Sequence, residues 1–242
     1  MSAYLDAVTA LGRGSLHPGG FSHTLQTLRR LSISPDDIVF DIGCGTGRTA
    51  CHIAKTYGAY VFALDNSEKM LAKARSRAAQ EGAVVNFVLG DALDLPFRDV
   101  TADFIIIESV LIFLPVRDVL RECFRVLKKG GVLVDIELIM KNSLPPAAAE
   151  QIRAFCGLFQ LPGLEEWIDF FREAGFTRAE VRQNRFPGFV ESLRELFCYD
   201  PFREVSRAKT DWNMIKTLFA YMSLMAKNRK HLGYGTFILT KD

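Results

Sequence analysis

The sequence predicts an α/β fold built on a doubly wound, mostly parallel sheet with helices on both faces. Between residues 38 and 139, short apolar runs alternate with longer amphipathic segments, which is the pattern of repeated strand-helix units. Each of the first four runs stops at an acidic residue or a glycine. Ligands of doubly wound sheets bind beyond the carboxyl ends of the strands, so these positions are where a binding site is expected.

Seven runs are expected to form strands. The first five are residues 38–42, 60–64, 84–89, 104–107 and 132–139. The residues that end the first four are Asp41 and Gly43, Asp65, Gly90 and Asp91, and Glu108. Later in the chain, residues 177–185 alternate as an edge strand does, and residues 234–240 form the last strand.

The helices between these strands have recognisable start and stop signals. Ser67 opens one helix, and Gly82 follows its end. Pro115 opens another, which is expected to close at residues 128–130. The basic side chains toward its end are expected to form a solvated face: Arg121, Arg125, Lys128 and Lys129. Two further helices are expected at residues 147–159 and 164–174.

Charge and composition exclude several classes of partner. The formal net charge is +2, from 30 basic and 28 acidic residues, so no strong field selects nucleic acid or an anionic membrane. The five cysteines lack the spacing of a zinc site or a disulfide framework. No apolar stretch approaches the roughly 18 residues of a membrane span. The prediction is a cytoplasmic protein with reduced thiols, no metal and no membrane span.

A glycine-rich loop follows the first strand, from Asp41 to Gly47. Glycines allow a tight turn and close approach of backbone to a ligand, and the following helix offers free N–H groups. A dinucleotide fingerprint would have its third glycine at position 48, where this chain has Arg48. The loop therefore departs from the nicotinamide-binding pattern, although an NAD-type oxidoreductase remains an alternative.

The run from Val39 to Gly47 resembles motif I of the class I S-adenosylmethionine-dependent methyltransferases, and residues 90–92 resemble the third motif of that family. The resemblance covers roughly residues 16–139 and points to the small-molecule, methyltransferase type 11 group. It implies a Rossmann-like, seven-stranded sheet with an antiparallel last strand and helical lid insertions. The implied function is methyl transfer from S-adenosylmethionine to a small-molecule acceptor, with S-adenosylhomocysteine as product.

The resemblance also implies a set of cofactor contacts. Asp65 would accept hydrogen bonds from both ribose hydroxyls. Asn66 and Met70 would border the adenine. The glycine loop would line the methionine moiety through Asp41, Gly43, Cys44, Gly45 and Thr46.

Two later strand ends complete this implied set. Asp91, flanked by Gly90 and Ala92, would accept a hydrogen bond from the adenine amino group, and the backbone N–H that follows would meet a ring nitrogen. Glu108 and Ser109 end the fourth strand. They would contact the amino group of the cofactor and the acceptor.

The segment before the first strand resembles the one that small-amine and phospho-base methyltransferases fold over the bound cofactor. Leu16, His17 and Gly20 are therefore candidate cofactor contacts. The alternative is that this loop and the helix after it only pack on the sheet. A general base is required only if the acceptor must lose a proton, and the candidates are His17, His23 and Glu108.

The predicted organisation is a single domain of 242 residues. Its parts are an N-terminal lid segment (1–34), a cofactor-binding core (35–140), helices and an edge strand (141–186), a helical lid (187–233) and the last strand (234–242). The lid is rich in aromatic residues and methionine, which suits an apolar, aromatic or cationic acceptor.

The fourth strand of nucleic-acid amino methyltransferases is followed by an Asn- or Asp-headed, proline-rich tetrapeptide that grips a flipped base. Here that place reads Glu-Ser-Val-Leu from residue 108, so nucleic acid is disfavoured as an acceptor. A third hypothesis is a catalytically inert module that binds the cofactor and regulates a partner.

Overall fold

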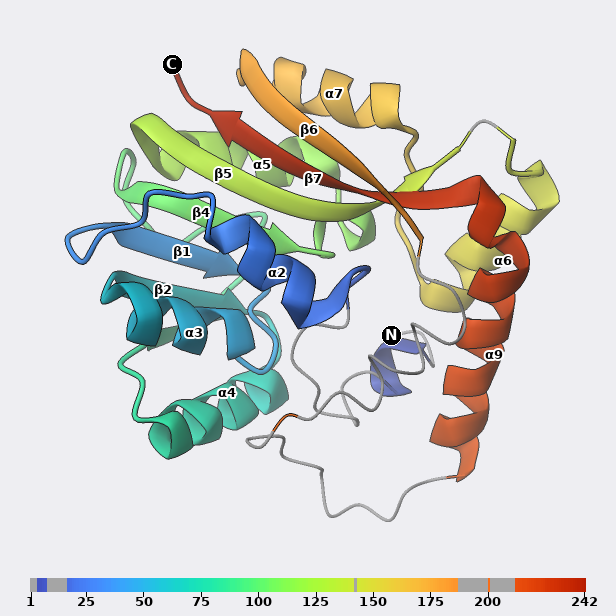
Figure 1. Cartoon of the computed structure of the whole chain (residues 1–242), viewed down its shortest axis with the longest axis horizontal. Coiled ribbons are helices and arrows are strands. Elements are labelled where there is room, and N and C mark those ends of the chain that lie inside the picture. Colours follow the sequence, from blue (N-terminus) through green and yellow to red (C-terminus); the bar gives the residue numbers. More distant parts are fainter. Residues whose placement is uncertain (1–3, 8–16, 142, 187–199, 201–211) are drawn as a thin grey trace.

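The computed structural model describes residues 4–7, 17–141, 143–186, 200 and 212–242. Its strands are β1 (Ile38–Ile42), β2 (Tyr60–Asp65), β3 (Asn86–Leu89), β4 (Ala102–Glu108), β5 (Leu127–Met140), β6 (Arg178–Arg185) and β7 (Leu232–Thr240). They form a seven-stranded sheet in the order β3-β2-β1-β4-β5-β7-β6 (Figure 1). Pairs from β3 to β5 are parallel, whereas β7 is antiparallel to both β5 and β6. The predicted fold class is confirmed.

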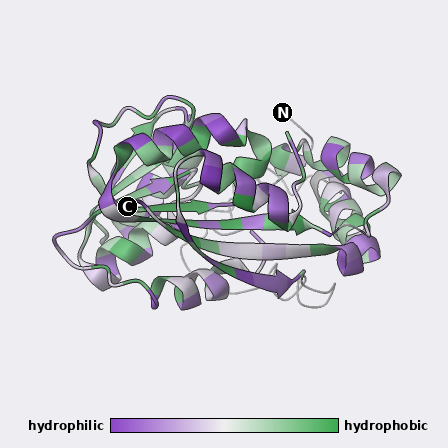
Figure 2. Ribbon diagram, turned by 90° about the horizontal axis from the view of Figure 1, so that it is seen from above, coloured by the Kyte–Doolittle hydropathy of each residue, from purple (hydrophilic) through white to green (hydrophobic). Residues whose placement is uncertain are grey.

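Helices cover both faces of this sheet. They are α2 (Gly20–Leu28), α3 (Arg48–Tyr57), α4 (Glu68–Glu81), α5 (Val116–Val126), α6 (Pro146–Cys156), α7 (Leu164–Glu173) and α9 (Trp212–Asn228), with short 3-10 helices η1 (Leu111–Phe113) and η2 (Arg229–His231). One apolar core includes Leu28 and Ile53 from α2 and α3. The other includes Leu120 and Trp167 from α5 and α7. Figure 2 shows the resulting layers, with helices on both sides of the strands.

The helix signals are correct for α4 and wrong for the end of α5. Ser67 caps α4 by accepting a hydrogen bond from the Met70 N–H, and Gly82 ends it with a φ of 65°. In contrast, α5 stops at Val126 and residues 127–131 already belong to β5. Lys128 pairs with Asp103 of β4 at 2.8 Å. Sheet pairing therefore overrides the local stop signal that Lys-Lys-Gly gave.

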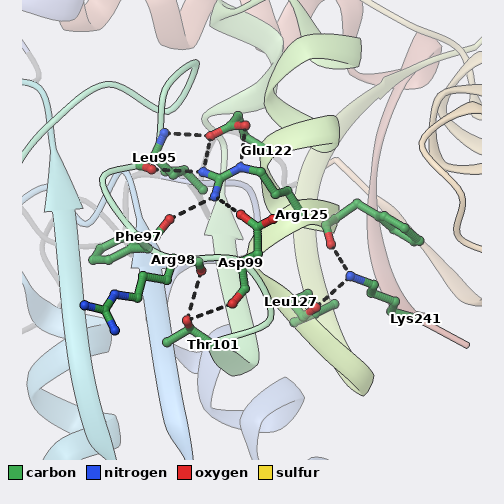
Figure 3. Close-up of polar contacts among 10 residues, drawn as sticks. Leu95, Phe97, Arg98, Asp99, Thr101, Glu122, Arg125, Leu127 and Lys241 are labelled. Carbon is green, nitrogen blue, oxygen red and sulfur yellow. Dashed lines mark hydrogen bonds and ion pairs between the residues drawn. The ribbon is translucent and has the colours of Figure 1, made fainter.

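Arg125 is also not part of a solvated helix face. Figure 3 shows its guanidinium turned toward the loop between β3 and β4. It donates to the carbonyl oxygens of Leu95 at 3.0 Å and Phe97 at 2.9 Å, and it pairs with Asp99 and Glu122. The loop's carbonyl groups need donors, and Arg125 provides them. Arg121 does match the prediction, because its side chain is 75% exposed.

The carboxyl ends of the parallel strands face helices from distant parts of the chain. Figure 1 shows α6 and α9 beyond the arrowheads of β1 and β4, with the helical turn of residues 4–7 beside them. The rings of Tyr4 and Tyr221 are in contact, with centroids 4.5 Å apart and planes tilted by 30°. Of the predicted lid, residues 187–199 and 201–211 lie outside the described residues. No helix in the described part of the chain is long and apolar enough to cross a bilayer.

Candidate functional site

A cavity of about 360 Å³ lies at the carboxyl ends of the parallel strands. Its wall brings together most of the site residues that the sequence predicted: His17, Asp41, Gly43, Cys44, Gly45, Thr46, Asp65, Asn66, Met70, Gly90, Asp91, Ala92, Glu108 and Ser109. Gly20 and His23 are described but do not line this cavity. Leu16 lies outside the described residues. One cavity therefore joins the ends of β1, β2, β3 and β4.

The glycine loop after β1 takes its shape from three glycines with positive φ, Gly43, Gly45 and Gly47. Gly43 has a φ of 72°, and a Cβ there would stand 2.3 Å from a methyl group of Val110. Gly45 has a φ of 53°, and a Cβ there would enter open space. Gly43 thus permits close packing on the loop after β4, whereas Gly45 leaves room for a ligand to approach the backbone.

Asp65 connects β2 to this loop. Its Oδ2 accepts a hydrogen bond from the Gly45 N–H at 2.8 Å, and its Oδ1 accepts one from the Ser67 N–H at 2.9 Å. Burial raises the pKa of Asp65, and the two N–H donors partly offset this shift. Each carboxylate oxygen has a second lone pair. Asp65 can therefore hold the loop and still accept hydrogen bonds from a ligand.

Three buried polar atoms of residues in the cavity wall have no hydrogen-bond partner among the described residues: Asp41 Oδ2, Thr46 Oγ1 and Ser109 Oγ. Buried polar groups are normally hydrogen-bonded, so this cluster indicates that a ligand supplies the partners. Burial, with Glu108 as a second cause, raises the pKa of Asp41 well above its ordinary value. An amino group and a carboxylate, such as those of a methionine moiety, fit this arrangement chemically.

Asp91 keeps its place at the end of β3 through a local turn. Its Oδ1 accepts a hydrogen bond from the Leu93 N–H at 2.9 Å. The side chain is exposed and lies in the cavity wall. Asn66 and Met70 line the same cavity.

Glu108, at the end of β4, is held by two threonines that sequence reasoning missed. Its Oε1 accepts a hydrogen bond from the Thr24 hydroxyl at 2.6 Å, and its Oε2 accepts one from the Thr49 hydroxyl at 2.7 Å. His17 Nε2 lies 2.9 Å from the Thr24 hydroxyl and 3.4 Å from Glu108 Oε1. Two of the three candidate bases, His17 and Glu108, are thus in contact. Thr24 of α2 links them, although α2 and β4 are far apart in sequence.

His23, the third candidate base, contacts the sheet and does not line the cavity. Its Nε2 lies 2.7 Å from the Thr236 hydroxyl of β7. Burial is the main cause that lowers its pKa, and His17 adds to the effect. This position favours a role in holding α2 on the sheet.

The other half of the cavity is mainly apolar. The residues that give it this character are Leu5, Ile112, Phe113, Leu114, Leu138, Leu158, Phe186 and Met225. Tyr4, Tyr221 and Cys156 add hydroxyl and thiol groups. Burial raises the pKa of both phenols, and it raises that of Cys156 to about 12, so these groups stay neutral. The aromatic pattern of α9 did indicate such a surface, but nothing in the sequence pointed to Tyr4.

A buried carboxyl group from β5 shapes the loop that follows β4. Glu137 Oε1 accepts hydrogen bonds from the backbone N–H groups of Val110 and Leu111, both at 2.7 Å. Ser109, just before them, has a φ of 54°, which is uncommon for a residue other than glycine. Glu137 therefore holds a strained turn next to Glu108, a role that sequence reasoning did not find.

Comparison with known proteins agrees with this geometry. A family model described as "Methyltransferase domain" matches residues 40–135. The uncharacterized methyltransferase YodH of Bacillus subtilis is 32% identical over 242 residues, which is 100% of both chains. Norajmaline N-methyltransferase of Rauvolfia serpentina is 30% identical, covering 78% of this chain and 69% of that protein.

Solved structures share the fold at lower identity. Phosphoethanolamine N-methyltransferase 2 of Haemonchus contortus, in complex with S-adenosyl-L-methionine, has a TM-score of 0.79 at 23% identity, covering 99% of this chain and 56% of that one. The [4+2]-cyclase SpnF has a TM-score of 0.79 at 20% identity, covering 99% and 92%. With the full-length match to a methyltransferase, the motif-bearing strand ends and the Rossmann-like sheet, the chain belongs to the class I S-adenosylmethionine-dependent methyltransferase family.

Proposed function

We propose that this protein transfers a methyl group from S-adenosylmethionine to a small-molecule acceptor by direct displacement. The observation that carries the proposal is that one cavity has two chemically different halves. Carboxylates, glycines and orphaned polar atoms line the half at the ends of β1, β2 and β3. Apolar and phenolic side chains line the half under α6 and α9. Such a division suits a polar cofactor next to an apolar acceptor.

The cofactor contacts follow from the chemistry of the first half. Asp65 would accept hydrogen bonds from the ribose hydroxyls, since its two backbone donors leave lone pairs available. Asp91 would accept one from the adenine amino group. Asp41 and Ser109, with their orphaned oxygens, would meet the methionine moiety beside Gly45. Asn66, Met70, Gly90 and Ala92 would border the adenine.

When bound, S-adenosylmethionine supplies a methyl group made electrophilic by the attached sulfonium. The protein's own contribution is alignment of the acceptor with that methyl group and exclusion of water. Glu108 lines this cavity at the end of β4, in contact with Thr24 and Thr49. The apolar half, including Leu138 and Phe186, would hold the body of the acceptor.

Calorimetric titration with S-adenosylmethionine and S-adenosylhomocysteine tests the cofactor half. We expect saturable binding in the micromolar range, with NAD as a matched control that does not bind. Absence of heat and of any thermal shift with folded protein would refute the proposal. A screen of metabolites with methyl-labelled cofactor would then identify the acceptor.

The two alternative functions are less well supported. In an NAD-type oxidoreductase the third glycine of the fingerprint lies where this chain has Arg48, whose guanidinium stacks 4.0 Å from the ring centre of Phe21. An inert cofactor-binding module would need no apolar half for an acceptor, whereas apolar and phenolic side chains line the same cavity as Glu108.

A further inference from the structure

The cluster of Glu108, Thr24 and His17 contains more acceptors than its protons can satisfy. His17 Nδ1 lies 3.1 Å from the carbonyl oxygen of Pro18. Because a carbonyl oxygen can only accept a hydrogen bond, we assign the ring proton of neutral His17 to Nδ1. His17 Nε2 and Glu108 Oε1 then compete for the Thr24 hydroxyl, at 2.9 Å and 2.6 Å.

A proton count shows what this geometry favours. The hydrogen-bond chain from Glu108 through Thr24 to His17 contains two donor–acceptor gaps. Each gap needs one proton to become a hydrogen bond. An ionised Glu108 and a neutral His17 leave only the hydroxyl proton of Thr24 to share between them. One gap therefore has no proton. Both hydrogen bonds can form only when the hydrogen-bond chain takes up one more proton. Buried polar chains gain most from complete pairing.

A ligand in the cavity can supply that proton, because two members of the cluster line the cavity wall. Glu108 and His17 line the cavity, whereas Thr24 lies behind them and is 1% exposed. Other titratable groups respond to the same cluster. Glu108 contributes to the raised pKa of Asp41, after burial, and His17 contributes to the lowered pKa of His23, after burial. The Thr49 hydroxyl donates to the other oxygen of Glu108, so Thr49 is not part of the hydrogen-bond chain from Glu108 to His17.

We propose that Thr24 relays a proton from Glu108 to His17, and that the acceptor is an apolar molecule whose nucleophile is a hydroxyl group. The proposal rests on the proposed function. The hydroxyl oxygen forms a bond to the methyl carbon as the carbon–sulfur bond breaks, and the bonding pair stays on sulfur. The hydroxyl proton passes to Glu108. Glu108 donates a proton to Thr24 while the Thr24 hydroxyl proton moves to His17 Nε2.

The product state holds an ionised Glu108 and a protonated His17, with both gaps filled. The proton returns to water by the same path after the product leaves. An amine acceptor that binds as the free base needs no such path before transfer, which is why the relay indicates a hydroxyl nucleophile. The apolar half of the cavity then receives the carbon skeleton.

The test uses 4-nitrophenol, whose ionised form absorbs visible light, with the protein saturated by sinefungin. Sinefungin has an amine in place of the methylsulfonium, so it keeps the positive charge and transfers nothing. At a pH where the free phenol is protonated, we expect the wild-type complex to bind it as the phenolate. Thr24→Val should lower the bound phenolate fraction about tenfold, the effect of one lost hydrogen bond to a charged group.

Two matched variants separate a relay from a structural effect. Thr24→Ser restores the hydroxyl and should restore the phenolate signal. Thr49→Val removes the other hydroxyl bond to Glu108 but leaves the path to His17, so it should retain clearly more of the phenolate signal than Thr24→Val does. The proposal is overturned if wild type binds only the neutral phenol or binds none at millimolar concentration, if Thr24→Val matches wild type, or if Thr49→Val loses as much. Calorimetry with sinefungin alone tests the proposed function separately. This titration measures binding of the cofactor analogue before any phenol is added.

Discussion

At the scale of single residues, Asp65 organises the glycine loop through its own hydrogen bonds. Its two oxygens accept the N–H groups of Gly45 and Ser67. The position of Asp65 at a strand end was predictable, because an apolar run followed by an acidic residue is a local pattern. Its contact with Gly45, 20 residues earlier, was not, since it depends on how β1 and β2 pair.

We expect Asp65→Ala to weaken binding of S-adenosylmethionine by roughly 1.5–3 kcal/mol, the range for lost hydrogen bonds to a charged group. Asp91→Ala should cost less, because Asp91 is exposed. Calorimetry measures both losses, and far-UV circular dichroism checks that the variants fold. Parent-like affinity in a folded Asp65→Ala protein would show that the ribose lies elsewhere.

Asp41 should make cofactor binding release a proton. Burial raises its pKa in the free protein, with Glu108 as a further cause. A cationic amino group beside Oδ2 would favour the ionised form and lower that pKa in the complex. The free protein then holds a proton that the complex does not, so affinity should rise with pH between the ordinary and the raised pKa.

The measurement is calorimetry in buffers with different ionisation enthalpies, which counts released protons. Asp41→Asn cannot release a proton and serves as the control. A wild-type binding enthalpy that is the same in every buffer would contradict this prediction.

At the scale of elements, α5 fixes the loop between β3 and β4 through one side chain. Arg125 donates to two backbone carbonyls and pairs with Glu122, whose Oε2 in turn accepts the Leu95 N–H at 2.9 Å. Sequence spacing placed Arg125 on a helix but could not show this loop folding back over it. Sheet pairing likewise decided that residues 127–131 extend β5.

Arg125→Lys should lower the free energy of unfolding by about 1–2 kcal/mol, because lysine cannot reach all of these acceptors at once. Arg121→Lys is the matched control on the same helix. Its exposed pair with Asp118 is worth about 0.2–1 kcal/mol at most, so the change should be smaller. Urea unfolding compares the two, and equal losses would mean that the loop contacts contribute nothing specific.

At the scale of the whole molecule, two carboxyl groups inside the core link stability to pH. Asp135 is 0% exposed, and neither of its oxygens has a partner among the described residues. Burial raises its pKa well above the ordinary value and raises that of Glu137 to about 8. Glu137 has two backbone donors that favour ionisation, so Asp135 keeps its proton to the higher pH of the two.

Stability should therefore fall as pH rises toward 8. The unfolded chain loses these protons near the ordinary carboxyl pKa, whereas the native state keeps them to higher pH. The contribution is fully present below the unfolded pKa and is lost as pH rises through the folded pKa, with a slope of about 1.4 kcal/mol per pH unit for each proton.

Asp135→Asn should flatten this dependence, since it removes one of the protons. The exposed Asp118→Asn serves as the control and should keep the wild-type slope. Urea unfolding at about pH 5.5 and about pH 8 measures the difference. Parallel pH dependences for wild type and Asp135→Asn would show that Asp135 is ionised in the native state.

Local sequence patterns were enough to predict the sheet, most of its helices and the strand-end residues that line the cavity, because apolar periodicity and glycine or acidic strand ends are local features. The remaining residues of the cavity wall are brought there by the tertiary fold. Thr24 meets Glu108 across 84 positions, and Glu137 meets Val110 across 27. Such contacts arise from strand order and helix packing, which bring together side chains that no sequence spacing relates.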